Sequence, residues 1–452
     1  MTALAKKLHL IDYFTLGFGV MVGTGWLVAM DNWLARGGSV GAMLGFVTGT
    51  VALFPVAYVY GMLVRAMPDA AGEVAYTARV FPEFVSFATG WTMLLSYFVV
   101  CPFEAVAAGK IAAHLFPILD SIELYRVAGQ PVYLPRLALG LLVVGVMTAI
   151  NYHGIRLSAN FQNWATAGVF VLAITFVSAG FTRGTPANLP PFFNGNAFVS
   201  VLLVVQIVPF FMEGFEAVGK SAEEASPDFG EHHYFRAIAL ALVIGGLFYF
   251  VIIAAVSYAA PRQVLIHERF ATATAFEKAL GSHWIASVVL AAAFLSLLKC
   301  FNASMVAASR LLFGLGRRKL VHQAVAYVHP VNRTPTTAIA WLGLGTALIL
   351  LGGESILVPV AEVGSVTAAV GWMAACASYA RMKPSVRGRV AAYLGLAVTA
   401  SLVFMKLAPG IPGHFSVYEW IAVAIWCSIG LSLHAWPAFR RSRVSPASGP
   451  RR

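Results

Sequence analysis

Two short runs in this chain carry groups that can bind a ligand inside a membrane. The first run is Val22, Gly23, Thr24, Gly25 and Trp26, and the second is Phe211, Met212, Glu213, Gly214 and Phe215. Each run lies near the middle of a hydrophobic stretch, although glycine inside a helix costs about 1 kcal/mol relative to alanine. Two such breaks in corresponding places predict discontinuous helices that frame a binding site at mid-membrane. The alternative is that the glycines only permit close helix packing.

The first run predicts a site for a carboxylate. An unwound helix segment leaves backbone N–H and C=O groups without intrahelical partners, and hydrocarbon tolerates such groups only where they line a cavity or hold a ligand. The N–H groups around Thr24, Gly25 and Trp26 begin a half-helix, whose positive dipole end favours an anion. The Thr24 hydroxyl adds a donor. Alternatively, these glycines pack beside an interfacial tryptophan.

Acidic and basic side chains within the hydrophobic stretches are further candidates. An ionised group at mid-membrane costs several kcal/mol unless it is paired or hydrated, so Glu213 is predicted to bind a substrate ammonium or to carry a proton. The alternative is a structural partnership with a buried cation. Lys299 lies in the middle of another span, and Glu104 lies at mid-depth, where it can line the pathway. Together with Glu213, these two residues are the candidates for ion or proton coupling. Asp31 and Glu362 are placed in an outer vestibule, or in structural roles.

The elements that must position these residues are transmembrane helices. The chain has 452 residues, of which 59% are hydrophobic and 11% charged, against about 25% charged in soluble domains. Spans of about 20 apolar residues are predicted at 14–35, 40–65, 84–117, 133–151, 160–181, 197–221, 236–260, 284–313, 336–352, 355–380, 390–408 and 417–437. The sequence therefore predicts an all-α, polytopic membrane protein with twelve spans.

The basic residues give the orientation of these spans. Most of the 31 lysines and arginines, among them Lys6, Lys7 and Lys220, fall in the N-terminus and in alternate loops. The positive-inside rule assigns these segments to the cytoplasm, and with them both termini. The two broken spans are the first and the sixth, so the second unit is inverted relative to the first. The predicted parts are a cytoplasmic N-terminus (1–13), a first five-helix repeat (14–181), a second, inverted repeat (197–380), two additional helices (390–437) and a basic cytoplasmic tail (438–452).

Other classes of protein are disfavoured by what the sequence contains. The four cysteines lie in apolar segments and are predicted to be core residues. The histidines show no metal-ligand spacing, so neither a metal site nor a cofactor is predicted. The positive charge is read as a topology signal near anionic lipid rather than as a nucleic-acid footprint. Enzyme motifs such as a P-loop or a metalloprotease helix are not found. A channel or a transporter-shaped sensor is the other rival class.

At this point the chain resembles the amino acid–polyamine–organocation superfamily, in the manner of its amino acid permeases. Gly23-Thr24-Gly25 is similar to the family's first-helix break. Met67 to Tyr76 resembles its loop after the second span, with Ala71 in place of a glycine. Gly214-Phe215-Glu216 is similar to its sixth-span signature. The resemblance implies a LeuT-type fold and secondary transport of amino acids or related amines.

The chain departs from the family pattern at two places. Met212 and Glu213 replace an aromatic gate and an aliphatic residue, which puts substrate identity at the second break. Some proton-coupled relatives hold a fifth-span lysine near the first break, where sodium-driven relatives bind an ion. Here the fifth-span stretch from Gln162 has no lysine. We therefore expect Lys299 to take the cation's place, unless it only forms an ion pair with Glu104 or Glu213.

The resulting expectation is transport of an amino acid across the cytoplasmic membrane, coupled to protons or to exchange and independent of sodium. An amino acid matches both the N–H groups of the first break and the carboxylate of Glu213. The alternative substrate is an amine without a carboxylate, such as a polyamine or an amino alcohol.

Overall fold

The computed structural model describes residues 4–435 except residues 269 and 283, so the predicted tail 438–452 lies outside the described residues. The helices of the first half are α1 (Leu10–Met21), α2 (Gly25–Val28), α3 (Met30–Ala66), α4 (Glu73–Ala78), α5 (Glu83–Leu115), α6 (Leu134–His153) and α7 (Ile155–Arg183). Those of the second half are α8 (Ala197–Val205), α9 (Val208–Met212), α10 (Ala217–Lys220), α11 (His232–Ala259), α12 (Arg262–Leu265), α13 (Ala271–Leu280), α14 (Trp284–Arg317), α15 (Thr336–Leu350), α16 (Leu357–Arg381), α17 (Val386–Leu407) and α18 (Val417–Ala435). Short 3₁₀ turns are η1 (Pro117–Asp120), η2 (Pro186–Asn188), η3 (Ala222–Glu224), η4 (Gln323–Ala326) and η5 (Gly353–Ile356).

In the described part of the chain, ten helical segments are long and apolar enough to cross a membrane. This confirms the prediction of a polytopic, all-α membrane protein. The two other predicted spans take different forms. The stretch 336–352 forms α15, which has only 15 residues. The stretch 197–221 is divided among α8, α9 and α10, because its middle is not helical.

The helix α3 contains the end of one predicted span and the whole of the next. Its backbone turns at Gly38, which has a φ of +71°. A side chain there would lie 2.6 Å from the carbonyl oxygen of Phe192, so only glycine fits this close approach. The first predicted span is thus made of α1, α2 and the start of α3, and it begins at Leu10, earlier than predicted.

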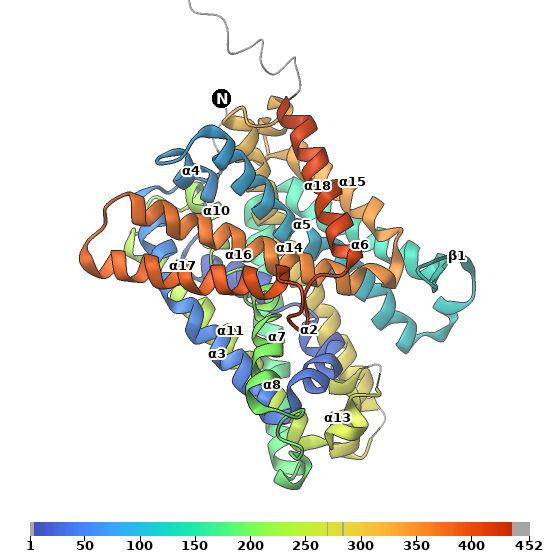
Figure 1. Cartoon of the computed structure of the whole chain (residues 1–452). Coiled ribbons are helices and arrows are strands. Elements are labelled where there is room, and N and C mark those ends of the chain that lie inside the picture. The colour runs from blue at the N-terminus through green and yellow to red at the C-terminus, as the bar shows by residue number, and fades with distance from the viewer. Residues whose placement is uncertain (1–3, 269, 283, 436–452) are drawn as a thin grey trace, which may run out of the picture.

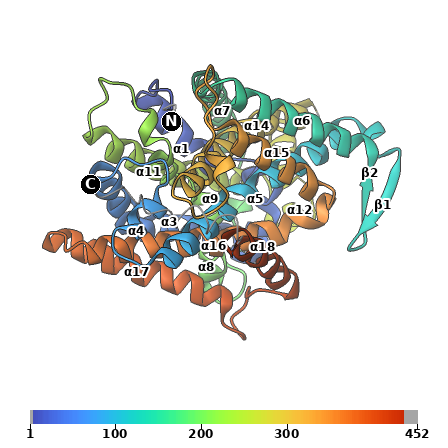
Figure 2. The same ribbon diagram turned by 90° about the horizontal axis from the view of Figure 1, so that it is seen from above.

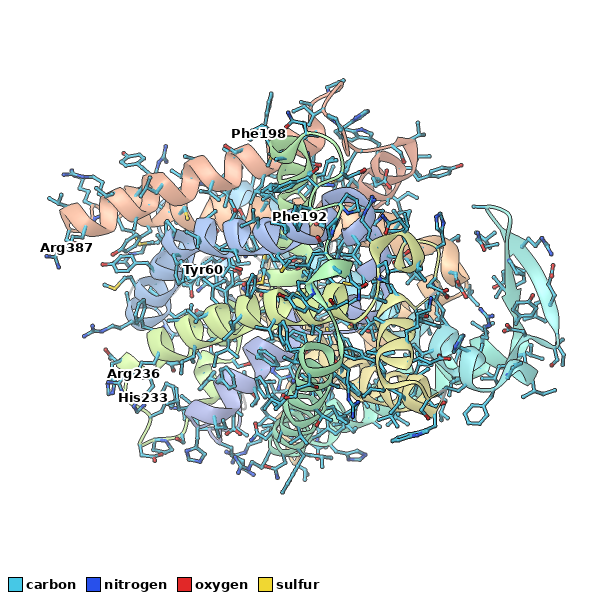
Figure 3. The ribbon with its side chains drawn as sticks, turned by 90° about the horizontal axis from the view of Figure 1, so that it is seen from below. Tyr60, Phe192, Phe198, His233, Arg236 and Arg387 are labelled. Atoms are coloured by element: carbon cyan, nitrogen blue, oxygen red, sulfur yellow. The ribbon has the colours of Figure 1, made fainter. Side chains whose placement is uncertain are left out.

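The helices nearest the centre of the bundle are those that carry the candidate residues. In the segment Leu10–Val28, 83% of the apolar window is buried, against 11% in the last span, Val417–His434. Figure 1 shows α17 alongside α16, with α4 and α10 at the upper left of the view, α13 at its lower right and β1 at its right. In Figure 3, Arg236 and Arg387 lie at one end of the bundle. The first span therefore lies in the buried centre of the bundle, and the last span lies at its periphery.

A β-hairpin between α5 and α6 is a feature that the sequence analysis did not predict. Its strands are β1 (Glu123–Val127) and β2 (Gln130–Tyr133), and they pair antiparallel. The turn between them is Ala128-Gly129, and both residues have positive φ, +48° and +80°, as a tight hairpin turn requires. Figure 2 shows the hairpin at the edge of the molecule.

Candidate functional site

The first break lies between α1 and α2, at residues 22–24, within the predicted run 22–26. Its carbonyl groups are bound by Lys299 of α14, whose Nζ donates to the carbonyl oxygens of Val22 (2.6 Å) and Gly19 (3.4 Å). Lys299 is fully buried. Among the described residues it has no carboxylate within ion-pair distance, so the pairing with Glu104 or Glu213 is not present. The ammonium instead lies on carbonyl oxygens that a helix break leaves free.

Two hydroxyl groups satisfy the other carbonyls of this segment. The Ser296 Oγ, one turn before Lys299 on α14, lies 3.1 Å from the Val22 oxygen and 2.9 Å from the Gly23 oxygen. The Tyr249 hydroxyl of α11 donates to the Met21 oxygen at 2.5 Å. The carbonyl side of the break is therefore held by side chains from two neighbouring helices, as buried backbone groups require.

The N–H side of the first break is held by a carboxylate. Glu104 of α5 accepts hydrogen bonds from the Thr24 backbone N–H at 3.1 Å and from the Thr24 hydroxyl at 2.8 Å. A side chain at Gly23 would lie 1.9 Å from Glu104 Oε1, so glycine is needed for this approach. The sequence predicted that these donors hold a substrate carboxylate. In this structure they hold the carboxylate of the protein's own Glu104.

Two further N–H groups of the half-helix α2 are not bound by Glu104. The N–H groups of Gly25 and Trp26 have no hydrogen-bond acceptor within the described part of the chain. Phe211 of the second run packs directly on Gly25, where a side chain would lie 2.4 Å from the phenyl ring. Phe211 thus covers the donors that Glu104 leaves free.

The second break lies between α9 and α10 and comprises residues 213–216. Gly214 has a φ of +135°, which disfavours any residue with a side chain. A Cβ at this position would also lie 2.6 Å from the Gly17 carbonyl oxygen and 2.9 Å from the Met21 nitrogen. Gly214 therefore permits the second break to pack closely against α1, while the two predicted runs themselves meet where Phe211 packs on Gly25.

Glu213 is fully buried at this second break. The Ser96 hydroxyl of α5 donates to its Oε1. Its Oε2 has no hydrogen-bond partner among the described residues. Met212, beside it, is also buried, with its sulfur 4.0 Å from the Thr50 hydroxyl. A buried carboxylate oxygen without a donor is costly, so Glu213 has the character of a binding group rather than of a completed structural contact.

Glu216 differs from Glu213 because both of its oxygens are used. Its Oε1 accepts from the Tyr97 hydroxyl at 2.8 Å, and its Oε2 accepts from the Gly214 N–H at 3.1 Å. Phe215 packs against the rings of Tyr60 and Trp372. The contacts of Glu216 are therefore those of a side chain that stabilises the second break.

A buried ion pair next to the second break was missed by the sequence analysis. Lys220, which was assigned to a cytoplasmic loop, is instead fully buried and pairs with Glu73. Its ammonium also lies over the rings of Tyr60 (5.5 Å) and Tyr97 (5.1 Å). Lys220 occupies the last position of α10. Because it lies at the predicted end of a span, the sequence did not indicate that its side chain is buried.

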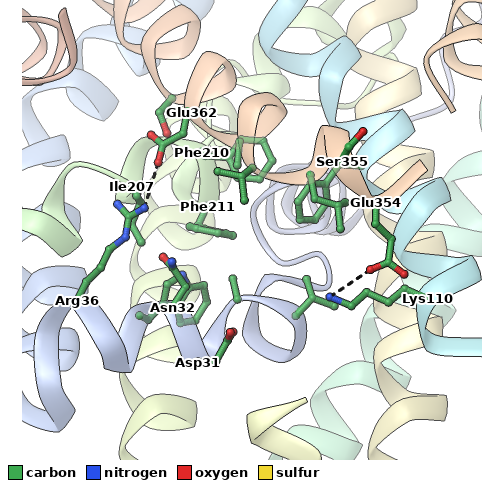
Figure 4. Close-up of a pocket in the computed structure, with 18 of the residues that line it drawn as sticks. Asp31, Asn32, Arg36, Lys110, Ile207, Phe210, Phe211, Glu354, Ser355 and Glu362 are labelled. Carbon is green, nitrogen blue, oxygen red and sulfur yellow. Dashed lines mark hydrogen bonds and ion pairs between the residues drawn. The ribbon is translucent and has the colours of Figure 1, made fainter. Parts of the chain in front are cut away.

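A cavity, here called the vestibule, lies between the hairpin and the second run, and both contribute residues to its lining. This cavity has a volume of about 490 Å³, and its lining includes Asp31, Glu362, Phe210 and Phe211. Asp31 and Glu362 thus line the vestibule, as one of the two predicted interpretations expected. Figure 4 shows the Arg36–Glu362 ion pair on one side of the cavity and the Lys110–Glu354 ion pair on the other. Phe211 belongs both to this lining and to the cover over Gly25.

The opposite end of the bundle is closed by ion pairs. Arg310 and Glu224 form two hydrogen bonds of 3.0 Å, and both side chains are fully buried. Arg317 contacts both Glu223 and Asp69. These contacts join α14 to the segment after α10 and to the loop before α4. These ion pairs therefore hold α14 against the segments on either side of it at this end of the bundle.

Ten helices long and apolar enough to cross a membrane, together with two helix breaks that carry buried charged groups, define the described part of the chain as a multi-pass membrane protein. The amino acid permease family model matches residues 13–429. The chain therefore belongs to the amino acid permease family, as the resemblance of its two breaks implied.

Individual relatives are distant but extend over most of the chain. The branched-chain amino acid permease BcaP of Bacillus subtilis is 23% identical over 366 residues, which cover 80% of this chain and 77% of the permease. The chloroplastic cationic amino acid transporter 6 of Arabidopsis thaliana is 26% identical and covers 93% of this chain and 74% of its own length. The glutamate/serine transporter AimA of Bacillus subtilis is 24% identical, and the matched residues cover 75% of this chain and 64% of AimA. These relatives are transporters and not enzymes.

Proposed function

We propose that this protein is a secondary active transporter that moves an amino acid across the cytoplasmic membrane by alternating access. The family supports amino acid transport, but the named relatives carry branched-chain, cationic and acidic or hydroxyl substrates, so they do not select one substrate. The observation that carries the proposal is the first break, whose free backbone groups meet a buried ammonium and a buried carboxylate.

The proposed architecture is twelve spans in a LeuT-type arrangement of two inverted five-helix repeats followed by two helices. The positions of the two breaks support it, because they fall in the predicted first and sixth spans. The short α15 is proposed as the ninth span. Both termini are proposed to lie in the cytoplasm, which agrees with the position of Arg236 and Arg387 at one end of the bundle (Figure 3).

The proposed substrate site lies between the two runs. The substrate carboxylate is assigned to the N–H groups of Gly25 and Trp26, which have no other acceptor among the described residues. The substrate ammonium is assigned to Glu213, whose Oε2 has no hydrogen-bond donor among the described residues. Phe211 must move off Gly25 to admit the substrate, so it is assigned the role of the outer gate.

Sodium independence is proposed from Lys299. Its Nζ lies on two carbonyl oxygens of the first span, which is a place that suits a monovalent cation. The corresponding fifth-span side chain, Gln162, donates instead to the Thr15 carbonyl oxygen at 3.0 Å. A tethered ammonium from α14 therefore leaves no role for a dissolved sodium ion there.

Counterflow in proteoliposomes tests the transport and the sodium proposals together. Proteoliposomes that contain the protein and are loaded with unlabelled L-leucine, L-lysine or L-glutamate should take up the same amino acid in labelled form. This uptake should be saturable, and its rate should be equal in sodium and potassium buffers. Lys299→Ala should lower transport by about tenfold or more, because the Gly19 carbonyl is left without a donor. The exposed Lys278 gives the control variant Lys278→Ala, which should match the wild type. Strict sodium dependence of the wild type contradicts the role of Lys299, and flux without saturable counterflow indicates a channel or a sensor.

The second candidate is an amine without a carboxylate, and the position of Glu104 favours it. Because Glu104 already occupies the Thr24 donors, two carboxylates, Glu104 and Glu213, frame the site. Competition of labelled L-lysine by cadaverine separates the candidates. Stronger competition by cadaverine than by lysine itself contradicts an amino acid substrate.

A further inference from the structure

The segment that precedes α1 lies on the bundle as an extended strap. This strap, residues 4–9, runs parallel to the segment that follows α10, and Leu8 pairs with Ala225 in an isolated β-bridge. The N–H groups of Lys7 and Leu8 both donate to the Glu224 carbonyl oxygen, at 2.8 and 2.9 Å. These contacts join backbone groups to backbone groups, so they hold the strap in one register.

The two leucines of the strap are buried. Leu8 is completely buried, and Leu4 is only 5% exposed. Leu4 packs in a small cluster with Ala70, Phe313 and Val328. These partners come from the loop before α4, from α14 and from the loop before α15. Burial of apolar side chains favours such a contact, so the strap is docked on the bundle through three segments that are distant in the sequence.

The other end of the strap is held by polar contacts. The Ser226 N–H donates to the Leu8 carbonyl oxygen at 2.9 Å, and the Ser226 Oγ lies 3.2 Å from His9 Nδ1. Arg156 of α7 donates to the Lys7 carbonyl oxygen at 3.3 Å. His9 is also the residue that immediately precedes α1. The strap is therefore continuous with the helix that leads to the first break.

The strap crosses the interface between α14 and the segment that follows α10. Its residue Leu4 contacts Phe313 of α14, whereas its later residues bind the Glu224 backbone in η3, just after α10. The Glu224 side chain forms the buried ion pair with Arg310 of α14. Separation of these two elements therefore breaks the ion pair and also pulls the strap from one of its partners. Both elements lead to the breaks, because α14 carries Lys299 and α10 follows the second break.

We infer that the strap is a latch, which must leave residues 224–226 before the bundle opens at this end, and that its release limits the rate of transport. This inference rests on the proposed function, because only a transporter that alternates between two open forms has such a step. None of the described residues that line the vestibule belongs to the strap or to residues 224–226. The latch and the proposed gate Phe211 thus control different openings. A segment held by few contacts opens at a lower free energy than the core, so the strap detaches while the helices stay folded.

A reversible cross-link tests whether the strap must move. The variant is Leu8→Cys/Ala225→Cys in a Cys427→Ser background, which removes the exposed native thiol. Paired strands lie about 4.8 Å apart, within the Cα separation of about 4.4–6.8 Å that a disulfide spans. Oxidation of the proteoliposomes should lower counterflow of L-leucine, L-lysine or L-glutamate by about tenfold or more, because the gating movement is blocked. Dithiothreitol should restore the counterflow.

The single variants Leu8→Cys and Ala225→Cys, in the same background and oxidised in the same way, are the matched controls and should keep their counterflow. Peptide mass spectrometry measures the cross-linked fraction. Fully cross-linked protein that transports as fast as its reduced form overturns the inference. Failure of the disulfide to form in the folded protein overturns it as well, because Leu8 and Ala225 then do not pair.

A weaker strap should open this end of the bundle more often. Leu4→Asp places a carboxylate in the apolar cluster around Leu4, which disfavours the docked strap. Cys300 of α14 reports the opening, because it is buried and its Sγ lies 3.2 Å from the Val20 carbonyl oxygen of α1. N-ethylmaleimide should modify Cys300 about threefold or more faster in this variant than in the wild type, as expected for a larger population of the open form.

Cys376 distinguishes opening of the bundle from unfolding. It is also completely buried, but it packs between α16 and α17, where a side chain at Gly395 would lie 2.6 Å from its Sγ. Leu4→Asp should leave the modification rate of Cys376 unchanged. The control variant Leu124→Asp, on the exposed strand β1, should leave both rates unchanged. Equal acceleration at Cys300 and Cys376 in Leu4→Asp, or no acceleration at Cys300, contradicts the latch.

The outcomes separate the latch from the function beneath it. Absence of saturable counterflow of all three amino acids in the wild type overturns the proposed function and the inference with it. Counterflow that is present in the wild type and persists in the cross-linked protein overturns the latch alone and leaves amino acid transport intact. Loss of counterflow on oxidation, together with selective modification of Cys300 in Leu4→Asp, supports both.

Discussion

The two breaks of this protein differ in how their charges are balanced. The first holds one buried ammonium, Lys299, and one buried carboxylate, Glu104, and each lies on complementary backbone groups of the unwound segment. The second is surrounded by three buried carboxylates, Glu73, Glu213 and Glu216, and by one buried ammonium, that of Lys220. At the first break, one acidic and one basic side chain therefore balance each other without a ligand, although the N–H groups of Gly25 and Trp26 have no acceptor among the described residues. At the second break, acidic side chains outnumber basic ones.

This difference indicates which break is generic and which is specific. The first break contacts the parts that all amino acids share, through backbone groups that a side-chain substitution does not remove. The second break places the carboxylate of Glu213 where an incoming cation would relieve the excess charge. Substrate selection in this chain is thus expected to depend on the second break, and substitutions there should change affinity more than they change the fold.

The largest expected effect comes from removing the one cation of the second break. Lys220→Met leaves the buried Glu73 carboxylate without its ion pair, which should destabilise the protein by about 3–5 kcal/mol. Thermal unfolding in detergent measures this loss. The double variant Lys220→Met/Glu73→Gln should recover most of it, because the uncompensated charge is removed as well.

A double variant as unstable as the single one would contradict this account. It would mean that Lys220 stabilises the protein through the Tyr60 and Tyr97 rings rather than through Glu73. The excess of carboxylates at the second break would then lose its significance, and the comparison with the first break would fail.

An intermediate effect is expected from Gly214, the glycine at which the second break packs against α1. Gly214→Ala introduces a Cβ 2.6 Å from the Gly17 carbonyl oxygen at a residue with positive φ, and should cost about 2–3 kcal/mol. The control is Gly145→Ala in α6, where a Cβ would have open space; it should change stability by less than about 1 kcal/mol, in the stabilising direction. Equal unfolding temperatures for the two variants would show that the close approach of Gly214 to α1 contributes little to stability.

The sequence allowed the places of both breaks to be predicted, but not the contacts that complete them. Glycines within apolar runs marked residues 22–26 and 211–215, and the cost of a buried charge singled out Glu213. The pairing of Thr24 with Glu104 spans 80 positions, and it depends on how α5 is rotated against α1, which periodicity does not specify. Lys220 was misassigned for a related reason, because a lysine at the end of an apolar run is equally typical of a loop.

The smallest and most selective effect is expected from the two neighbouring glutamates of the second break. Glu213→Gln removes the carboxylate that is assigned to the substrate ammonium. It should weaken binding of an amino acid by roughly 10- to 100-fold, as expected for loss of one charge-assisted hydrogen bond. Its unfolding temperature should equal or exceed that of the wild type, because a buried charge without a full set of donors is removed.

Glu216→Gln is the matched control, three residues away on the same segment. The amide oxygen can still accept from the Gly214 N–H, and the Tyr97 hydroxyl can rotate to accept from the amide nitrogen. We expect a change of less than about threefold in affinity and of less than about 1 kcal/mol in stability. The two variants therefore differ in the size of their effect on affinity, since only Glu213→Gln is expected to lower affinity markedly, and it does so without lowering stability. Comparable losses of affinity in both would show that the carboxylates act as one cluster, and that neither is dedicated to the substrate.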